Sequence, residues 1–207
     1  MTLDLHAYLD SLASAEPTPG GGSGSALVAQ TGAALVAMVA RIALLNAKLA
    51  MHHDAAREIV RRADALRAKL ELARAGDESA YAAVVRAMQL PRATSDERSS
   101  RTATLQDALG AAAEPPLAIA ESAALVVRLA ERALALENTN LTSDLGCAAE
   151  FGAAGLRAAA YNVQANHRYL KDRERTRAQA ARLAKAESDV TAPLARVRFE
   201  TSRALAP

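Results

Sequence analysis

The segment TSDLG holds the side chains best suited to chemistry, because Ser143 and Asp144 come at the predicted start of a helix. Asn138 and Asn140 precede them in a stretch rich in residues that favour turns. The dipole and the free N–H groups at a helix N-terminus keep a carboxylate ionised, and an ionised carboxylate can accept a proton or stabilise a cation. The spacing alone favours the simpler interpretation, in which Asp144 is an N-cap.

A second polar loop, PTPGGGSGS, is predicted from Pro17 to Ser25, directly before an alanine-rich helix. Backbone N–H groups at a helix N-terminus favour an anion or a developing oxyanion, and glycine lets a ligand approach closely. The candidate binding residues of this loop are Pro19, Gly20, Gly21, Gly22 and Ser23. The pattern is neither GxGxxG after a strand nor GxxxxGK[ST], so it argues against a nucleotide site. Taken alone, glycines before a helix are more often a simple turn.

Helical spacing of apolar residues extends through almost the whole chain and predicts an all-α protein, a bundle of long, antiparallel, alanine-rich helices. The central helix is expected to run from about Ser25 toward His52, with small residues that let neighbouring helices approach closely. An amphipathic helix follows and is expected to stop at Gly76. A further helix is predicted over 77–89. The next is expected to begin at a cap formed by Ser95 or Asp96, and Pro115 and Pro116 divide it from another helix that extends to about 137. The last two are predicted over 147–170 and over 171–205, the latter with an interruption near Pro193.

The composition limits the class of protein. With 207 residues the chain has the size of one large domain, so we expect a single domain over 1–207. Hydrophobic residues make up 51% of the chain and aromatic residues only 3%, so Ala, Leu and Val must form the core. The net charge of +2 lacks the basic excess expected of a nucleic-acid-binding domain, and we expect no nucleic-acid partner.

The sequence also bears on compartment and metal binding. Cys147 is the single cysteine, which excludes an intrachain disulfide, and the first residues lack the pattern of a secretory signal. We therefore expect a cytoplasmic protein. The apolar stretch that ends before Arg41 predicts a buried helix in preference to a membrane span. His52 and His53 are adjacent, and adjacent helical residues face different directions, so we expect no metal site.

Four motifs together resemble the cyclodeaminase/cyclohydrolase family of folate one-carbon enzymes. They are PTPGGGSGSALVAQTGAALVAMVA, MQLPRAT, NTNLTSDLGCAA and LRAAAYNVQANHRYLKD, in that order along the chain. The resemblance implies a cyclodeaminase-like helical homodimer that binds a reduced folate and acts at the carbon bridging N5 and N10. It implies either closure of 5-formiminotetrahydrofolate to the 5,10-methenyl cation with loss of ammonia, or interconversion of that cation and 10-formyltetrahydrofolate. It also implies that folate is the substrate and that no separate cofactor is used.

The resemblance assigns expected roles to residues. Asp144 matches the acid of the family's SDxG motif and is the expected catalytic carboxylate, while Asn138, Asn140 and Ser143 match the surrounding motif and would orient folate or water. Asn162 and Asn166 match NVxxN and share a helix face, which suits either the folate cleft or polar bonding between helices. Asp77 and Tyr81 are a weaker match to a family acid and aromatic residue, and they also suit ordinary helix packing.

The chain departs from the family after the central helix, where members often carry a run close to ANLTxGKKKY and this chain reads ARIALLNAKLA. Lys48 is the one remaining amine, expected either to donate a proton or bind a folate carboxylate, or to be a solvated lysine. Arg41 replaces an asparagine and could supply an anion contact. Loss of the other lysines leaves a second hypothesis open, a divergent folate- or anion-binding helical dimer without efficient catalysis. A purely structural oligomer is a third.

Overall fold

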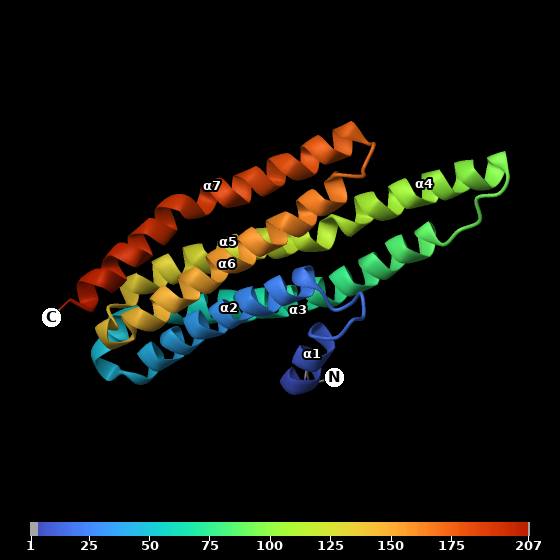
Figure 1. The fold of residues 1–207 in the computed structure, drawn as a ribbon. Coiled ribbons are helices and arrows are strands. Elements are labelled where there is room, and N and C mark those ends of the chain that lie inside the picture. Colours follow the sequence, from blue (N-terminus) through green and yellow to red (C-terminus); the bar gives the residue numbers. More distant parts are fainter. Residues whose placement is uncertain (1–3, 207) are drawn as a thin grey trace.

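The computed structural model describes residues 4–206 and is all-helical over that range, which confirms the predicted fold class (Figure 1). The long helices lie roughly alongside one another in an elongated bundle. The elements are α1 (Leu5–Leu12), α2 (Gly21–Leu45), the 3₁₀ helix η1 (Ala47–His52), α3 (His53–Met88), α4 (Ser95–Ala112), α5 (Glu114–Ala133), η2 (Leu134–Leu136), η3 (Thr139–Leu141), α6 (Thr142–His167) and α7 (Arg173–Ala204).

The core forms around α2, which packs against α3, α5 and α6. Small residues let α2 and α6 approach closely: a Cβ on Gly155 would lie 2.9 Å from the Cβ of Ala29, and a Cβ on Gly32 would lie 2.8 Å from the Ala148 carbonyl oxygen. By length and hydropathy α2 would also suit a membrane span. Its inner side is nevertheless buried in the core between neighbouring helices, as the sequence predicted.

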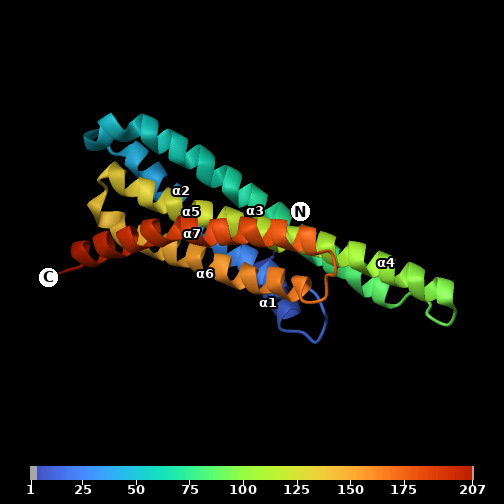
Figure 2. The same ribbon diagram turned by 90° about the horizontal axis from the view of Figure 1, so that it is seen from above.

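These contacts fix the direction of α6 relative to α2. Gly21, at the start of α2, lies next to Asn162 near the end of α6, whereas Gly32 lies next to Ala148 near the start of α6. The two helices are therefore antiparallel. α3 lies on the opposite side of the bundle from α6 and α1 (Figure 2).

The predicted end points of the central helix are wrong at both ends. α2 begins at Gly21, inside the segment expected to be a loop, because Gly20 is its extended N-cap and the residues after it are already helical. It ends at Leu45, where Asn46 takes an extended conformation and its side chain accepts the Lys48 backbone N–H to open η1. Local sequence signals locate a helix better than they locate its first residue.

Three further boundary predictions are wrong. α3 continues through Gly76, because Gly76 has no positive φ and forms no C-terminal cap. The cap of α4 is Thr94, which forms a capping box with Glu97. α7 continues through Pro193 without a break. The division at Pro115 and Pro116 is confirmed, since both prolines lie in the first turn of α5, where their missing N–H groups cost no helical bond.

Candidate functional site

The cavity whose lining residues are best suited to catalysis lies where α2 begins. A cavity of about 230 Å³ is formed there by the loop before α2, the middle of α3 and the last turns of α4 and α6. Its lining residues are Pro17, Thr18, Gly20, Gly21, Gly22, Asp77, Tyr81, Ala112, Asn162 and Asn166. The Thr18–Pro19 peptide bond is cis, and Pro19 lies directly before the glycines. The structure thus brings the glycine loop, both family asparagines and the weakly matched Asp77 and Tyr81 together.

Gly22 is needed for Asp77 to occupy its position. A Cβ at residue 22 would lie 2.3 Å from Oδ2 of Asp77, closer than any real contact. The missing side chain lets the carboxylate of α3 lie against the first turn of α2, where the helix dipole favours negative charge. From the sequence alone this glycine could belong to a ligand site or to a simple turn. The structure shows that it makes room for the Asp77 carboxylate.

The pKa of Asp77 is raised to about 6, mainly because burial penalises its charged form and also because Glu78 is a neighbouring negative charge. The Ser23 backbone N–H lowers the pKa in part by stabilising the carboxylate. A carboxyl with a pKa near 6 can take up and return a proton close to neutral pH. Perturbed carboxyls in a cavity are typical of functional sites.

Ser23 connects the site to α1 and α3. Its buried hydroxyl lies 2.8 Å from the Tyr8 hydroxyl and donates to Oε1 of Glu78 at 2.8 Å. Arg74 stacks over the Tyr8 ring at 5.4 Å and also pairs with Glu78 at 3.0 Å. Ser23 was expected to bind substrate, and the structure instead shows its hydroxyl engaged inside the protein. Its role here is to hold the start of α2 beside Asp77.

Asn162 and Asn166 line the cavity and also bond within the bundle, so both sequence interpretations apply. The Asn162 amide donates to the Ala158 carbonyl at 2.9 Å. The Asn166 amide donates to the Asn162 carbonyl at 3.0 Å and to the Ala112 carbonyl of α4 at 3.2 Å. Each side-chain amide thus donates to backbone, which leaves its oxygen and, in Asn162, a second N–H for a ligand.

The other predicted residues lie at the far end of the bundle. Asp144 is in the first turn of α6, whose N-cap is Leu141, so the prediction that Asp144 caps the helix is wrong. Ser143 is exposed beside it. Asn138 and Asn140 line a separate open cavity of about 1010 Å³ together with residues of α5 and α7.

Lys48 and Arg41 also lie away from the glycine loop. Lys48 is exposed on η1. Arg41, near the end of α2, pairs with Asp64 of α3 at 2.5 Å, which already occupies its guanidinium. Neither residue lines the cavity at the start of α2.

Within a single chain, Asp144 lies far from the glycine loop. Asp144 and Asn162 are eighteen residues apart on the continuous helix α6, and a rise of 1.5 Å per residue separates them by about 27 Å. The predicted residues therefore form two groups, one at each end of the bundle. We call them the Asp77 site, which is the cavity described above, and the Asp144 end, which comprises Asn138, Asn140, Ser143, Asp144 and Lys48.

Sequence reasoning gave Asp77 too little weight. Asp77 and Gly22 are 55 residues apart, and nothing in the local pattern around Asp77 differs from an ordinary helix. Glu78 and Tyr8 were not singled out at all. The usable signal was the match of Asp77 and Tyr81 to a family acid and aromatic residue, together with the glycines that make room for a side chain.

Comparison with known proteins decides the family. The family model described as Formiminotransferase-cyclodeaminase matches residues 4–185. The chain belongs to this family. The family predicted from the four motifs is therefore confirmed.

Relatives include proteins named for two activities. The chain is 38% identical over 169 residues to a methenyltetrahydrofolate cyclohydrolase of Methylorubrum extorquens, covering 82% of this chain and 81% of that protein. It is 31% identical over 176 residues to the formimidoyltransferase-cyclodeaminase of Rattus norvegicus, covering 84% of this chain but only 32% of that longer protein. The crystal structure of formiminotetrahydrofolate cyclodeaminase from Thermotoga maritima superposes with a TM-score of 0.87 at 25% identity, over 97% of this chain and 96% of that one.

Proposed function

We propose that this chain is a folate one-carbon enzyme that acts at the carbon bridging N5 and N10 of tetrahydrofolate, with methenyltetrahydrofolate cyclohydrolase as its first candidate activity. The observation that carries the proposal is Asp77, a carboxyl with a pKa near 6 in a cavity formed by the glycine loop and two asparagines. The cyclohydrolase of Methylorubrum extorquens supports this choice, because the match covers about four fifths of both chains.

In the forward reaction water adds to the cationic methenyl carbon. Asp77 in its ionised form accepts one proton from the attacking water, which leaves a neutral tetrahedral carbon bearing a hydroxyl group. The protonated Asp77 then donates to N5 while the bond between N5 and that carbon breaks with its electron pair on N5. The hydroxyl proton is released to solvent, and the products are 10-formyltetrahydrofolate and one proton. The amide oxygens of Asn162 and Asn166 would orient the water or the pterin edge.

Cyclodeaminase activity is the second candidate, favoured by the similarity to the Thermotoga maritima enzyme over nearly the whole of both chains. In that reaction N10 attacks the formimino carbon and ammonia leaves from the resulting tetrahedral carbon. A carboxyl that is partly protonated near neutral pH can donate to the leaving nitrogen. The same site therefore suits both reactions.

Several parts of the proposal come from the family resemblance. Asp144 serves as a second catalytic carboxylate, and Lys48 binds a folate carboxylate or donates a proton. Asn138, Asn140 and Ser143 orient the substrate, and folate is the substrate without a separate cofactor. The enzyme acts as a homodimer in the cytoplasm. Lys48 is exposed and so is able to meet a ligand, whereas the pairing of Arg41 with Asp64 argues for a structural role of Arg41.

The test is to incubate the purified protein with each substrate separately. Loss of the near-ultraviolet absorbance of 5,10-methenyltetrahydrofolate, faster than the spontaneous rate, would establish the cyclohydrolase. Ammonia release from 5-formiminotetrahydrofolate with no effect on the methenyl compound would establish the cyclodeaminase. Saturable folate binding without turnover of either would contradict the enzyme and favour the divergent binding protein.

A further inference from the structure

A groove between α3 and α5 differs from the Asp77 site in both place and character. It has a volume of about 380 Å³, within the range of about 300–1,000 Å³ that is typical of small-molecule sites. Its walls come from residues 62–69 of α3 and 125–132 of α5. Within the described range 4–206 the two cavities have no lining residue in common. We call it the α3–α5 groove.

The groove combines an apolar floor with a cationic rim. Its lining residues follow the spacing i, i+3, i+4, i+7 on each helix, so α3 and α5 each turn one face toward it. Leu66 and Leu129 are core residues that form the floor, and Leu125 beside them is 42% exposed. The charged residues of the lining are three arginines and one lysine, which give it four positive charges and no negative one.

α3 and α5 run antiparallel along the groove (Figure 2). A Cβ on Gly76 of α3 would lie 3.8 Å from Cγ of Pro115 in α5, whereas residues 62–69 of α3 line the groove with residues 125–132 of α5. Lower numbers on α3 therefore correspond to higher numbers on α5. Since both helices rise by about 1.5 Å per residue, position 62 lies level with about position 129.

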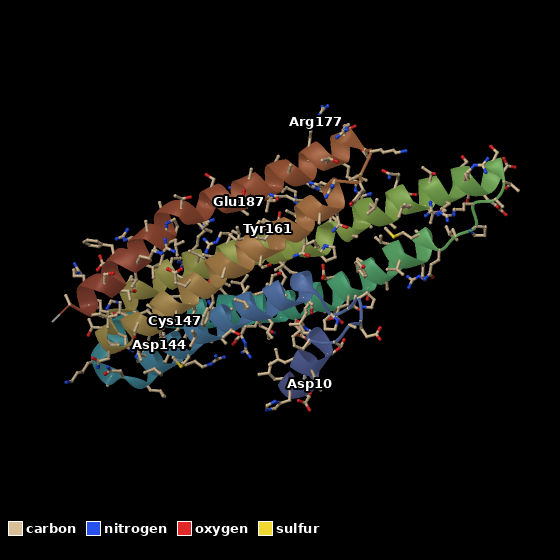
Figure 3. All side chains as sticks on the ribbon, in the orientation of Figure 1. Asp10, Asp144, Cys147, Tyr161, Arg177 and Glu187 are labelled. Carbon is tan, nitrogen blue, oxygen red and sulfur yellow. The ribbon has the colours of Figure 1, made fainter. Side chains whose placement is uncertain are left out.

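This register gathers the three arginines at one end of the groove. Arg62 lies level with a point between Arg128 and Arg132, whereas Leu125 lies about one turn farther along. The arginine end is the one nearer to Asp144, which Figure 3 shows at the start of α6, because Arg132 also lines the open cavity there. The groove thus has a cationic end and an apolar end.

The cationic end is only partly neutralised by the protein. Arg62 pairs with Glu58, and Arg128 lies 3.7 Å from Asp189 of α7. Arg132 forms no ion pair with a residue of the described range. A guanidinium group offers N–H donors in a planar fork that matches a phosphate group. This end of the groove therefore suits the head of a phosphorylated ligand.

The chemistry of the lining also limits the rest of the ligand. The side chains carry hydrogen-bond donors but no carboxylate, amide or hydroxyl group, so N–H or O–H groups of a ligand would find no side-chain acceptor. A hydrocarbon chain needs no acceptor, and leucine removes its apolar surface from water. The floor is about two helical turns long, and isolated helices that short are marginal in water. These features favour an alkyl chain over a helix of another protein.

We propose that the α3–α5 groove is a second binding site, separate from the folate site, for a single-chain amphiphile. Its alkyl chain lies on the leucines, and its phosphate head group is held by the three arginines. The head supplies the charge and the chain supplies the apolar contact, so neither part binds well by itself. This site does not depend on the chemistry at Asp77, because none of its residues takes part in that chemistry.

Binding of decyl phosphate below its critical micelle concentration, measured by isothermal titration calorimetry, tests the site without any assay of activity. The full chain should bind one molecule saturably. Inorganic phosphate lacks the chain, and decyl maltoside carries the same chain on an uncharged head. Each should bind at least about tenfold more weakly, since each lacks one of the two interactions. A longer alkyl chain should raise the affinity by up to about fourfold for each CH₂ group that the groove buries.

Two matched pairs of variants distinguish the groove from the rest of the surface. Arg62→Gln should weaken the binding of decyl phosphate about tenfold. Arg61→Gln should leave it unchanged, because Arg61 pairs with the same Glu58 but does not line the groove. Leu125→Ala should weaken binding roughly three- to tenfold, whereas Leu72→Ala should not, since Leu72 is 75% exposed outside the groove.

Several results would overturn the proposed site. The first is an absence of saturable decyl phosphate binding by the wild-type protein. An equal loss in Arg62→Gln and Arg61→Gln would mean a general attraction of anions to the basic surface. Binding to vesicles that contain phosphatidic acid, with none to the monomeric amphiphile, would mean a membrane surface. Displacement of decyl phosphate by 5-formyltetrahydrofolate would make the groove part of the folate site.

Discussion

Oδ2 of Asp77 lies 2.3 Å from the point where a Cβ of residue 22 would be, so the glycine at that position and the carboxylate on α3 depend on each other. The glycine loop therefore has a role beyond forming a turn. It makes room for a carboxyl group at the N-terminus of the central helix, and burial at this position raises the pKa of that carboxyl toward neutrality.

Replacing Gly22 by alanine should displace Asp77 and remove most turnover. The added methyl group overlaps the carboxylate, which must rotate away from the first turn of α2. The matched control is Gly24→Ala, because a Cβ there meets only Leu12 Cδ2 at 3.9 Å. Steady-state turnover of both variants checks the prediction, and equal activity of Gly22→Ala and Gly24→Ala would refute it.

The Asp77→Asn variant should be more stable than wild type above about pH 6. Folding raises the pKa of Asp77, so the folded protein holds this proton more tightly and wild-type stability falls as the pH rises from about 4 to about 6. The gain at pH 7.5 should be about 1 kcal/mol, allowing for the solvent exposure of this half-buried group. Urea unfolding of wild type and variant at about pH 4 and at pH 7.5 measures this gain, and a variant less stable than wild type at pH 7.5 would contradict the prediction.

Removal of the Ser23 hydroxyl should lower stability by about 1–3 kcal/mol, because it leaves the buried Tyr8 hydroxyl without its partner and takes one hydrogen bond from the half-buried Glu78. Tyr8→Phe is the matched variant, since it removes the outer hydrogen bond and keeps the ring beneath Arg74. It should cost less than Ser23→Ala in chemical denaturation. A larger loss in Tyr8→Phe would mean that Ser23 is not the centre of this network.

Gly76→Ala should raise the free energy of unfolding by about 0.5–1 kcal/mol, because glycine inside a helix is less favourable than alanine. A Cβ at this position has room, with Pro115 Cγ as its nearest neighbour at 3.8 Å. Gly155→Ala is the contrasting case, since its Cβ would lie 2.9 Å from Ala29 and force α2 and α6 apart. Thermal unfolding of the two variants should therefore shift in opposite directions, and destabilisation by Gly76→Ala would contradict the continuous helix α3.

The sequence was sufficient for the features that depend on local chemistry. Apolar spacing predicted the helical bundle, and Pro115 and Pro116 predicted the start of α5. It failed where packing decides: Gly76 and Pro193 interrupt nothing, because α3 and α7 are held along their length by neighbouring helices. A single glycine or proline is only a local preference, which tertiary contacts override.

The candidate site was only half predictable for a related reason. The motifs identified the glycine loop, Asn162 and Asn166, which the structure brings together. They did not indicate that Asp144 lies at the other end of α6, because the order of motifs along a chain says nothing about which ends of antiparallel helices meet. Asp77 needed the fold to be found, since its contact with Gly22 joins segments far apart in the sequence.

The most direct test of the central claim is the pH dependence of kcat/KM for 5,10-methenyltetrahydrofolate turnover, measured well below KM so that it reports the free enzyme, after subtraction of the spontaneous rate. If Asp77 is the group that accepts the proton from water, turnover should rise with pH around a midpoint near 6. Asp77→Asn should lose most of the turnover together with that midpoint, while Gly24→Ala should keep both. A wild-type profile retained in Asp77→Asn would show that the reaction does not use this carboxylate.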